Sequence, residues 1–212
     1  MCWPLRHKKF VGRFLALSYG VTAMPAQCPT IRERFALYRQ FIEEQKMVQE
    51  SPLRLKGGGT NAGWVTAASP LLHPTISEKT EFVAKQSRRN FPKYELKIMA
   101  PFLCERPCFR FESDGPPHRN NFPEIPLPEQ QVTTPHFHHF TRDGYELAYK
   151  TDALRNSGNC QAIIRDMSFG VSHFCQEGQI GRLDGGVPEV QAEGIPLSLP
   201  TNIDPLEGVP FH

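Results

Sequence analysis

Apolar and polar residues alternate at several places along the chain, which is the pattern of a half-buried β-strand. Residues 94–98 (YELKI) follow this period of two. Phe109 and Phe111 flank Arg110 in the same way. If the two phenylalanines face a core, Arg110 faces the opposite side of the sheet. These two runs therefore predict neighbouring strands of a sheet that has one polar face.

Residues 135–150 predict a β-hairpin. Asp143-Gly144 is a strong turn signal, and alternating apolar residues lie on both sides of it. In the first strand the period of two places His136 and His138 side by side on one face. The intervening Phe137 and the following His139 point to the other face.

The segment before these strands has apolar residues at the spacing of a helix. Thr30 and Glu33 match a capping box, and Ser51-Pro52 is a stop signal. Between them lies a stripe of apolar residues at helical spacing, namely Ile31, Phe35, Tyr38 and Ile42. This pattern predicts one amphipathic helix over residues 31–50, packed against the sheet.

Three further segments give weaker signals. Apolar residues at 53–55 and 63–65 bracket the glycine run 57–59, which predicts a turn between two strands. A phosphate-binding loop is the alternative, but no Lys-Ser/Thr pair follows the glycines. Residues 75–90 fit both helix and strand patterns, and residues 161–164 predict one more strand.

Length and proline content give the domain organisation. A chain of 212 residues with 39% apolar residues suits one domain. Its 20 prolines favour edge strands and long loops over a helix bundle. We therefore expect an α+β domain over residues 30–178, with a mostly antiparallel sheet, one main amphipathic helix and long proline-rich loops. Residues 1–29 are expected to form a disordered leader, and residues 179–212 an extended tail rich in Gly and Pro.

The start of the chain loosely imitates a signal peptide, because basic residues precede a short apolar run. Ser18 and Gly20 interrupt that run. No stretch approaches the roughly 20 apolar residues of a membrane-spanning helix. Six cysteines in a chain of this length do not make a disulfide scaffold, so we expect reduced thiols and a cytoplasmic protein without membrane contact.

Four of the eight histidines, His118, His136, His138 and His139, lie between residues 109 and 151. Three interpretations remain open. His136 and His138 could bind one metal ion together with His118 or Glu112. Alternatively, the histidines could act as acid and base on a phosphodiester, with Arg110 or Arg119 binding the phosphate. In the third interpretation the histidines only form structural hydrogen bonds. No cofactor is predicted.

Cysteines offer a rival metal site. Cys104 and Cys108 are separated by three residues, and His173-x-Cys175 follows later. The spacing is permitted for zinc, but a complete second pair is missing. The chain also lacks a GxSxG elbow and a dinucleotide-binding fingerprint.

The histidine-rich region also resembles a group of proteins. The runs are Arg110-Phe-Glu112, Asp114-Gly-Pro-Pro-His118-Arg-Asn120 and Pro135-His-Phe-His138. Together they resemble a pattern found in small uncharacterised bacterial proteins, some encoded near toxin–antitoxin or defence genes. The resemblance covers residues 93–151. It implies a bacterial, cytoplasmic protein with a site made of Arg110, His118, Asn120, His136 and His138.

Two functional hypotheses follow. The first is a small toxin-like or defence-associated enzyme that acts on RNA phosphodiesters, or on another phosphate-bearing ligand, through the His/Arg cluster. The second is a non-enzymatic module that binds a protein partner, in which the histidines are structural or hold a metal. The net charge of +2 weighs against the first, because a nuclease usually displays a basic groove. Convergence of Arg110 and the histidines around one open pocket would favour an enzyme.

Overall fold

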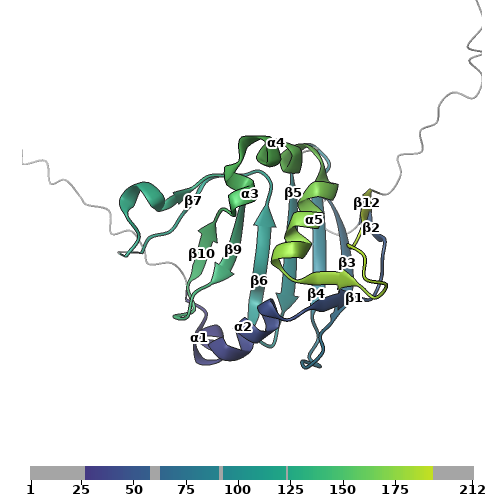
Figure 1. Cartoon of the computed structure of the whole chain (residues 1–212), viewed down its shortest axis with the longest axis horizontal. Helices are drawn as coiled ribbons and strands as arrows, with labels where there is room; N and C mark the ends of the chain where they lie inside the picture. The colour runs from purple at the N-terminus through teal and green to yellow at the C-terminus, as the bar shows by residue number, and fades with distance from the viewer. Residues whose placement is uncertain (1–26, 58–62, 91–92, 123, 193–212) are drawn as a thin grey trace, which may run out of the picture.

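The structure is a computed structural model, which describes residues 27–57, 63–90, 93–122 and 124–192. Within these ranges helices flank one large, mostly antiparallel sheet, as expected for an α+β domain (Figure 1). Of the predicted leader, only residues 27–29 are described. Of the predicted tail, only residues 179–192 are described.

Twelve strands and five α-helices make up the described chain. The strands are β1 (Lys46–Val48), β2 (Leu53–Gly57), β3 (Trp64–Leu72), β4 (Glu81–Ser87), β5 (Tyr94–Ala100), β6 (Cys104–Glu112), β7 (His118–Arg119), β8 (Gln131–Val132), β9 (His136–Phe140), β10 (Glu146–Tyr149), β11 (Ile180–Arg182) and β12 (Val190–Ala192). The helices are α1 (Pro29–Glu33), α2 (Phe35–Glu43), α3 (Asp152–Arg155), α4 (Ser157–Arg165) and α5 (Met167–Glu177), with a 3-10 turn η1 (Leu127–Glu129).

The main sheet has ten strands in the order β10-β9-β6-β5-β4-β3-β1-β11, and β2 pairs with both β3 and β12. Neighbours from β10 to β1 are antiparallel, whereas β1 with β11 and β2 with β12 are parallel. Strands β7 and β8 form a separate two-stranded ribbon beside β10 (Figure 1). Strand β10 is thus one edge of the main sheet.

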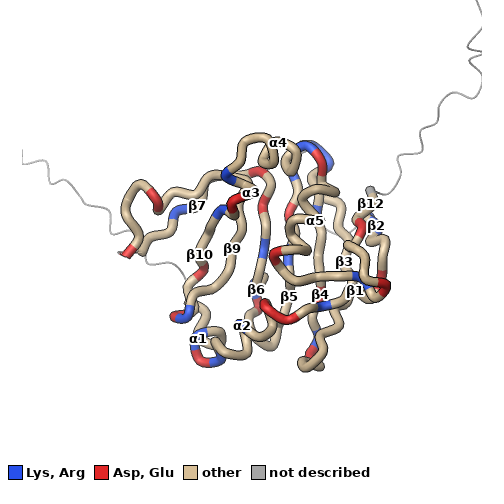
Figure 2. Tube along the Cα trace, in the orientation of Figure 1, with Lys and Arg blue, Asp and Glu red and all other residues tan. Residues whose placement is uncertain are grey.

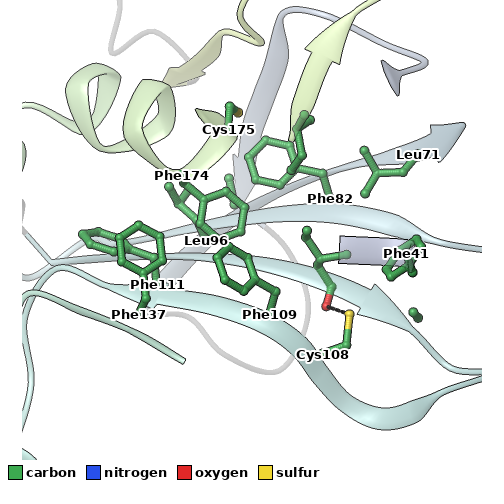
Figure 3. Close-up of a cluster of buried hydrophobic side chains, with 14 of the residues drawn as sticks. Phe41, Leu71, Phe82, Leu96, Cys108, Phe109, Phe111, Phe137, Phe174 and Cys175 are labelled. Atoms are coloured by element: carbon green, nitrogen blue, oxygen red, sulfur yellow. Dashed lines mark hydrogen bonds between the residues drawn. The ribbon is translucent and has the colours of Figure 1, made fainter. Parts of the chain in front are cut away.

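Aromatic packing covers one face of the central strands. The Phe174 ring of α5 lies against those of Phe82, Phe109 and Phe137, at centroid distances of 5.6, 5.3 and 6.2 Å (Figure 3). All four side chains are buried. Burying one such ring contributes about 1.5–3 kcal/mol, so this layer anchors α5 on the sheet.

The opposite face of the same strands is polar. Along β5 and β6 it carries Glu95, Lys97, Arg110 and Glu112, which are half-buried. An antiparallel sheet can leave one face to water in this way. The predictions for β5, for Arg110 between Phe109 and Phe111, and for the hairpin of β9 and β10 are therefore confirmed.

The predicted helix over residues 31–50 was wrong in length and number. A break at Arg34 separates α1 from α2, α2 ends at Glu43, and β1 follows. The reason lies in Lys46, whose Nζ donates to the carbonyl oxygens of Phe41 at 2.7 Å and Glu44 at 2.7 Å. A buried lysine that caps the carbonyl end of α2 turns the chain into the sheet, where β1 pairs with β3 and β11.

The three weaker sequence signals gave both correct and wrong predictions. Strands β2 and β3 pair antiparallel, as the glycine-run prediction required, although residues 58–62 lie outside the described chain. The ambiguous segment 75–90 contains strand β4. The predicted strand over residues 161–164 was wrong, because this stretch lies in α4, where the Asn156 side chain caps the first turn.

The segment predicted as an extended tail adds two short strands. Ile180–Arg182 pairs with β1, and Val190–Ala192 pairs with β2. Residues up to 192 thus belong to the sheet. None of the helices in the described ranges has the length and apolar character needed to cross a membrane.

Candidate functional site

The candidate site lies on the polar face, where β6 meets β9. Arg110 pairs with His138 and Glu112 pairs with His136 in the antiparallel register. Directly opposed residues of an antiparallel pair lie on the same face with their Cβ atoms about 4.5–5.5 Å apart. Strand pairing therefore brings the two histidines, the arginine and the carboxylate into contact.

His118 joins this group from the ribbon. It lies on β7, which pairs with β8. Its ring centroid is 4.8 Å from that of His138 and 6.3 Å from that of His136. The rings of His136 and His138 are 4.6 Å apart. The structure thus brings together four of the five residues predicted for the site.

The fifth residue, Asn120, has a different place. Its Nδ2 donates to the backbone oxygen of Ala148 at 2.8 Å, and its Oδ1 accepts from the backbone N–H of Ala148 at 2.9 Å. The amide thus satisfies both backbone groups that Ala148 presents at the free edge of β10. Because the side chain is buried and both its polar atoms are engaged, Asn120 closes an edge strand and connects the loop to the sheet.

Carboxylates surround Arg110. Its guanidinium lies 3.0 Å from Glu112 Oε1 through Nη1 and 2.9 Å from Glu146 Oε1 through Nε. Its Nη2 is 3.3 Å from His138 Nδ1. Two acids therefore neutralise the one cation. Figure 2 likewise shows acidic and basic residues interspersed along the strands.

Glu146 was missed by the sequence analysis. It lies opposite Phe140 in the hairpin register, on the face of His138, and its Oε1 is 3.4 Å from His138 Nδ1. The signal was present, because counting outward from the Asp143-Gly144 turn gives this pairing. The missing step was to apply the face assignment to the second strand as well as to the first.

Burial governs the chemistry of the histidines. His136 and His138 are 1% and 2% exposed, and His118 is half-buried. Desolvation lowers the pKa of His136 to about 4, and the nearby His118 and Arg110 add to this effect. Desolvation, with Arg110 next, also lowers the pKa of His138. The pKa of His118 is lowered by desolvation as well. The three imidazoles are therefore neutral at pH 7.

Nε2 of His138 lacks a hydrogen-bond partner among the described residues, and the two nitrogens of His136 have only a backbone contact at Thr133, which acts against the lowering of its pKa. An unsatisfied buried polar atom costs about 1–3 kcal/mol. Native structures keep few such atoms, and each calls for a physical cause. The under-satisfied nitrogens lie in two adjacent rings on one face of the sheet.

Glu112, His136 and His138 also match the donor set of a metal site. One ligand atom from each lies within 4.8 Å of the others. Glu112 Oε2 is 3.8 Å from His136 Nε2. For metal–ligand bonds of about 2.0–2.1 Å, two ligands of one ion lie at most about 4.2 Å apart. The spread of 4.8 Å exceeds this limit, so the side chains would have to move closer together to bind one ion.

The rival cysteine site finds less support. Cys108 is fully buried, and its Sγ donates to the Ile98 carbonyl oxygen at 3.3 Å (Figure 3). Burial raises the pKa of this thiol. His173 lies on α5 and contacts the Thr151 hydroxyl at 2.8 Å through Nε2. A buried, protonated thiol is a poor zinc ligand, which disfavours the Cys104–Cys108 pair.

Searches of protein-family models, of curated proteins and of solved structures find no match for this chain.

Proposed function

We propose that this protein binds one divalent transition-metal ion through Glu112, His136 and His138. The observation that carries the proposal is that buried imidazole nitrogens short of hydrogen-bond partners lie within 4.8 Å of one another and of one carboxylate oxygen. Two neutral imidazoles and one carboxylate form a donor set used for zinc and for ferrous iron. Lowered histidine pKa values favour this role, since a ring must be unprotonated to bind a metal.

Glu146 supports the same proposal from behind His138. When a histidine binds a metal through one nitrogen, the other usually donates to a carboxylate, which fixes the tautomer. Arg110 Nη2, which can only donate, lies 3.3 Å from His138 Nδ1, and Glu146 Oε1 lies 3.4 Å from it. On metal binding, Nδ1 would donate to Glu146 in place of accepting from Arg110. Nε2, the nitrogen without a partner, is then left to the metal.

Three protein ligands leave a coordination position free. This arrangement is typical of catalytic zinc sites, in which a water or substrate takes the fourth position, whereas structural sites have four protein ligands. His118 lies beside both ligand histidines and can receive a proton from a bound water or become the fourth ligand. The function supported best is therefore a mononuclear metal centre that accepts a water or a small ligand.

The phosphodiester hypothesis is supported less well than the metal centre. It needs a free cation for the phosphate, but Glu112 and Glu146 already neutralise Arg110. It also needs a protonated histidine as general acid near neutral pH, whereas the histidines have lowered pKa values. Action on RNA, a protein partner and a cytoplasmic location stay predictions.

Cobalt binding tests the metal centre. Metal-stripped protein is titrated with Co²⁺, and binding is followed by the visible absorption of the bound ion and by calorimetry. We expect one ion per chain. His136→Gln and His138→Gln should weaken binding at least about 10-fold, and Glu146→Ala about 10–100-fold because it removes the carboxylate beside His138 Nδ1.

His139→Gln is the matched control, because His139 lies on the same strand but faces Tyr149 on the opposite side of the sheet. This variant should bind Co²⁺ like the wild type. Equal binding by His138→Gln and the wild type, with both proteins folded by circular dichroism, would refute the metal centre.

A further inference from the structure

A hollow of about 530 Å³ lies along the outer edge of β10, beside the histidine cluster and separate from it. The loop that carries β7, η1 and β8 forms its outer wall, and β10 with the end of α3 forms the inner wall. Cavities of about 300–1,000 Å³ commonly hold small organic molecules. The residues that matter for its chemistry are Ile125, Val132, Leu147, Ala148, Lys150 and Arg155.

The hollow is preformed, because buried side-chain amides hold its outer wall. Gln130 Nε2 donates to the carbonyl oxygens of Phe122 at 3.1 Å and Ile125 at 3.0 Å. Asn120 connects the start of the same loop to Ala148 at the cavity floor. A ligand would therefore meet a wall that is already ordered, and binding would require little further ordering of the chain.

The walls combine apolar surface with a cation. Ile125, Val132 and Leu147 contribute aliphatic surface. Arg155 is paired with Asp152 at 3.2 Å. Lys150 is half-buried and forms no ion pair with a carboxylate of the described chain. Glu129 also lines the hollow, but it is exposed and forms no ion pair with Lys150. A half-buried, unpaired lysine beside apolar walls favours an anionic head with an apolar body.

We propose that this hollow binds a small amphipathic carboxylate, with its head at Lys150 and its aliphatic body along Ile125, Val132 and Leu147. Ala148 lies opposite His138 in the hairpin, and Lys150 follows two residues later, beside His136. The carboxylate head would thus lie next to the proposed metal centre. Binding in the hollow does not depend on that centre, because no proposed ligand of the metal lines it.

Octanoate is the probe, measured by calorimetry against the full-length protein. Octylammonium has the same tail and the opposite charge, and acetate has the same head without the tail. We expect octanoate to bind one molecule per chain, at least about 10-fold more tightly than either comparison compound. Lys150→Gln should weaken octanoate binding about 10-fold, and Lys150→Glu should reverse the preference toward octylammonium.

Lys85→Gln is the matched control, since Lys85 is a half-buried strand lysine on β4, remote from the hollow. It should leave octanoate binding unchanged. Each titration is run with and without Zn²⁺. Octanoate binding that requires Zn²⁺ and ignores Lys150 substitutions would overturn the cavity proposal while supporting the metal centre. Equal binding of octanoate and octylammonium by the wild type would overturn it as well.

Discussion

The two faces of strand β9 differ sharply although their residues alternate along five positions. On one face Phe137 packs against Phe109, Phe111 and Phe174, with centroid distances of 4.9–6.2 Å, and is fully buried. On the other face His136 and His138 are almost as buried, but Nε2 of His138 lacks a partner among the described residues and His136 has only a backbone contact at Thr133. The two faces are thus almost equally buried, but only the Phe137 face has its packing contacts complete.

The difference teaches that burial alone does not identify a core. The Phe137 face is stabilised by contacts already present, because α5 covers it. The His136/His138 face keeps polar atoms that water no longer reaches, which is unfavourable unless a ligand satisfies them. The four predictions below test this contrast, beginning with the largest expected effect.

Replacing Phe137 by Ala should destabilise the protein by about 3–5 kcal/mol, because it leaves a cavity among packed rings. His138→Leu in the metal-free protein should change the free energy of unfolding by no more than about 1 kcal/mol. That change removes a buried nitrogen that has no hydrogen-bond partner. Arg110 still forms its ion pairs with Glu112 and Glu146. Urea unfolding of both variants gives the comparison, and a large loss in His138→Leu would show that this face is an ordinary core.

Zinc should stabilise the wild type by about 2.7 kcal/mol when its free concentration is 100 times the dissociation constant. The reason is that the ion binds the folded arrangement of Glu112, His136 and His138. Thermal unfolding with Zn²⁺ or EDTA measures the shift. Phe137→Leu should show the same zinc shift from a lower starting stability, whereas His138→Leu should show none. An equal shift in His138→Leu would place zinc elsewhere.

Asn120→Ala should destabilise the protein by about 1–3 kcal/mol, because it leaves the buried backbone N–H and carbonyl of Ala148 without partners. Amide hydrogen exchange should accelerate at Ala148 and remain unchanged at Phe111 in the centre of the sheet. Asn120→Asp keeps the acceptor and loses the donor, so its effect should be intermediate. Slow exchange at Ala148 in Asn120→Ala would contradict the bridging role.

Acid should weaken the metal-free protein between about pH 6.5 and pH 4 through His136. Its folded-state pKa is lowered to about 4, so in this window the unfolded chain binds more protons than the folded one. Stability from this residue is therefore complete above pH 6.5 and is lost as the pH falls. In His136→Gln the decline measured by urea unfolding in EDTA should be shallower. Parallel curves for the two proteins would contradict the lowered pKa.

Local patterns predicted the strands well. The period of two around Arg110 and the Asp143-Gly144 turn placed β6, β9 and β10 and the faces of their side chains. Such signals work because side-chain alternation and turn chemistry are properties of short segments. The same counting rule, applied to the second hairpin strand, would have identified Glu146.

Predictions failed where distant contacts overrode local preference. Residues 46–48 extend a helical stripe in sequence, yet they pair with β3 and β11, and Lys46 caps α2. Asn120 was predicted as a site residue from its neighbours in the pattern, yet the edge of β10 engages both its polar atoms. The pairing of residues 46–48 and the bonds of Asn120 to Ala148 both involve partners more than ten residues away.

The sequence by itself determined the alternation that puts His136 and His138 on one face and Phe137 on the other, because strand geometry fixes it. Only the tertiary structure decided that Glu112, Arg110 and Glu146 meet these histidines, and that His118 approaches them from a separate ribbon. It also decided that the rings are buried and that Nε2 of His138 has no hydrogen-bond partner among the described residues. The physical reason is that register and burial arise from pairing between segments far apart in the chain, which local propensity does not encode.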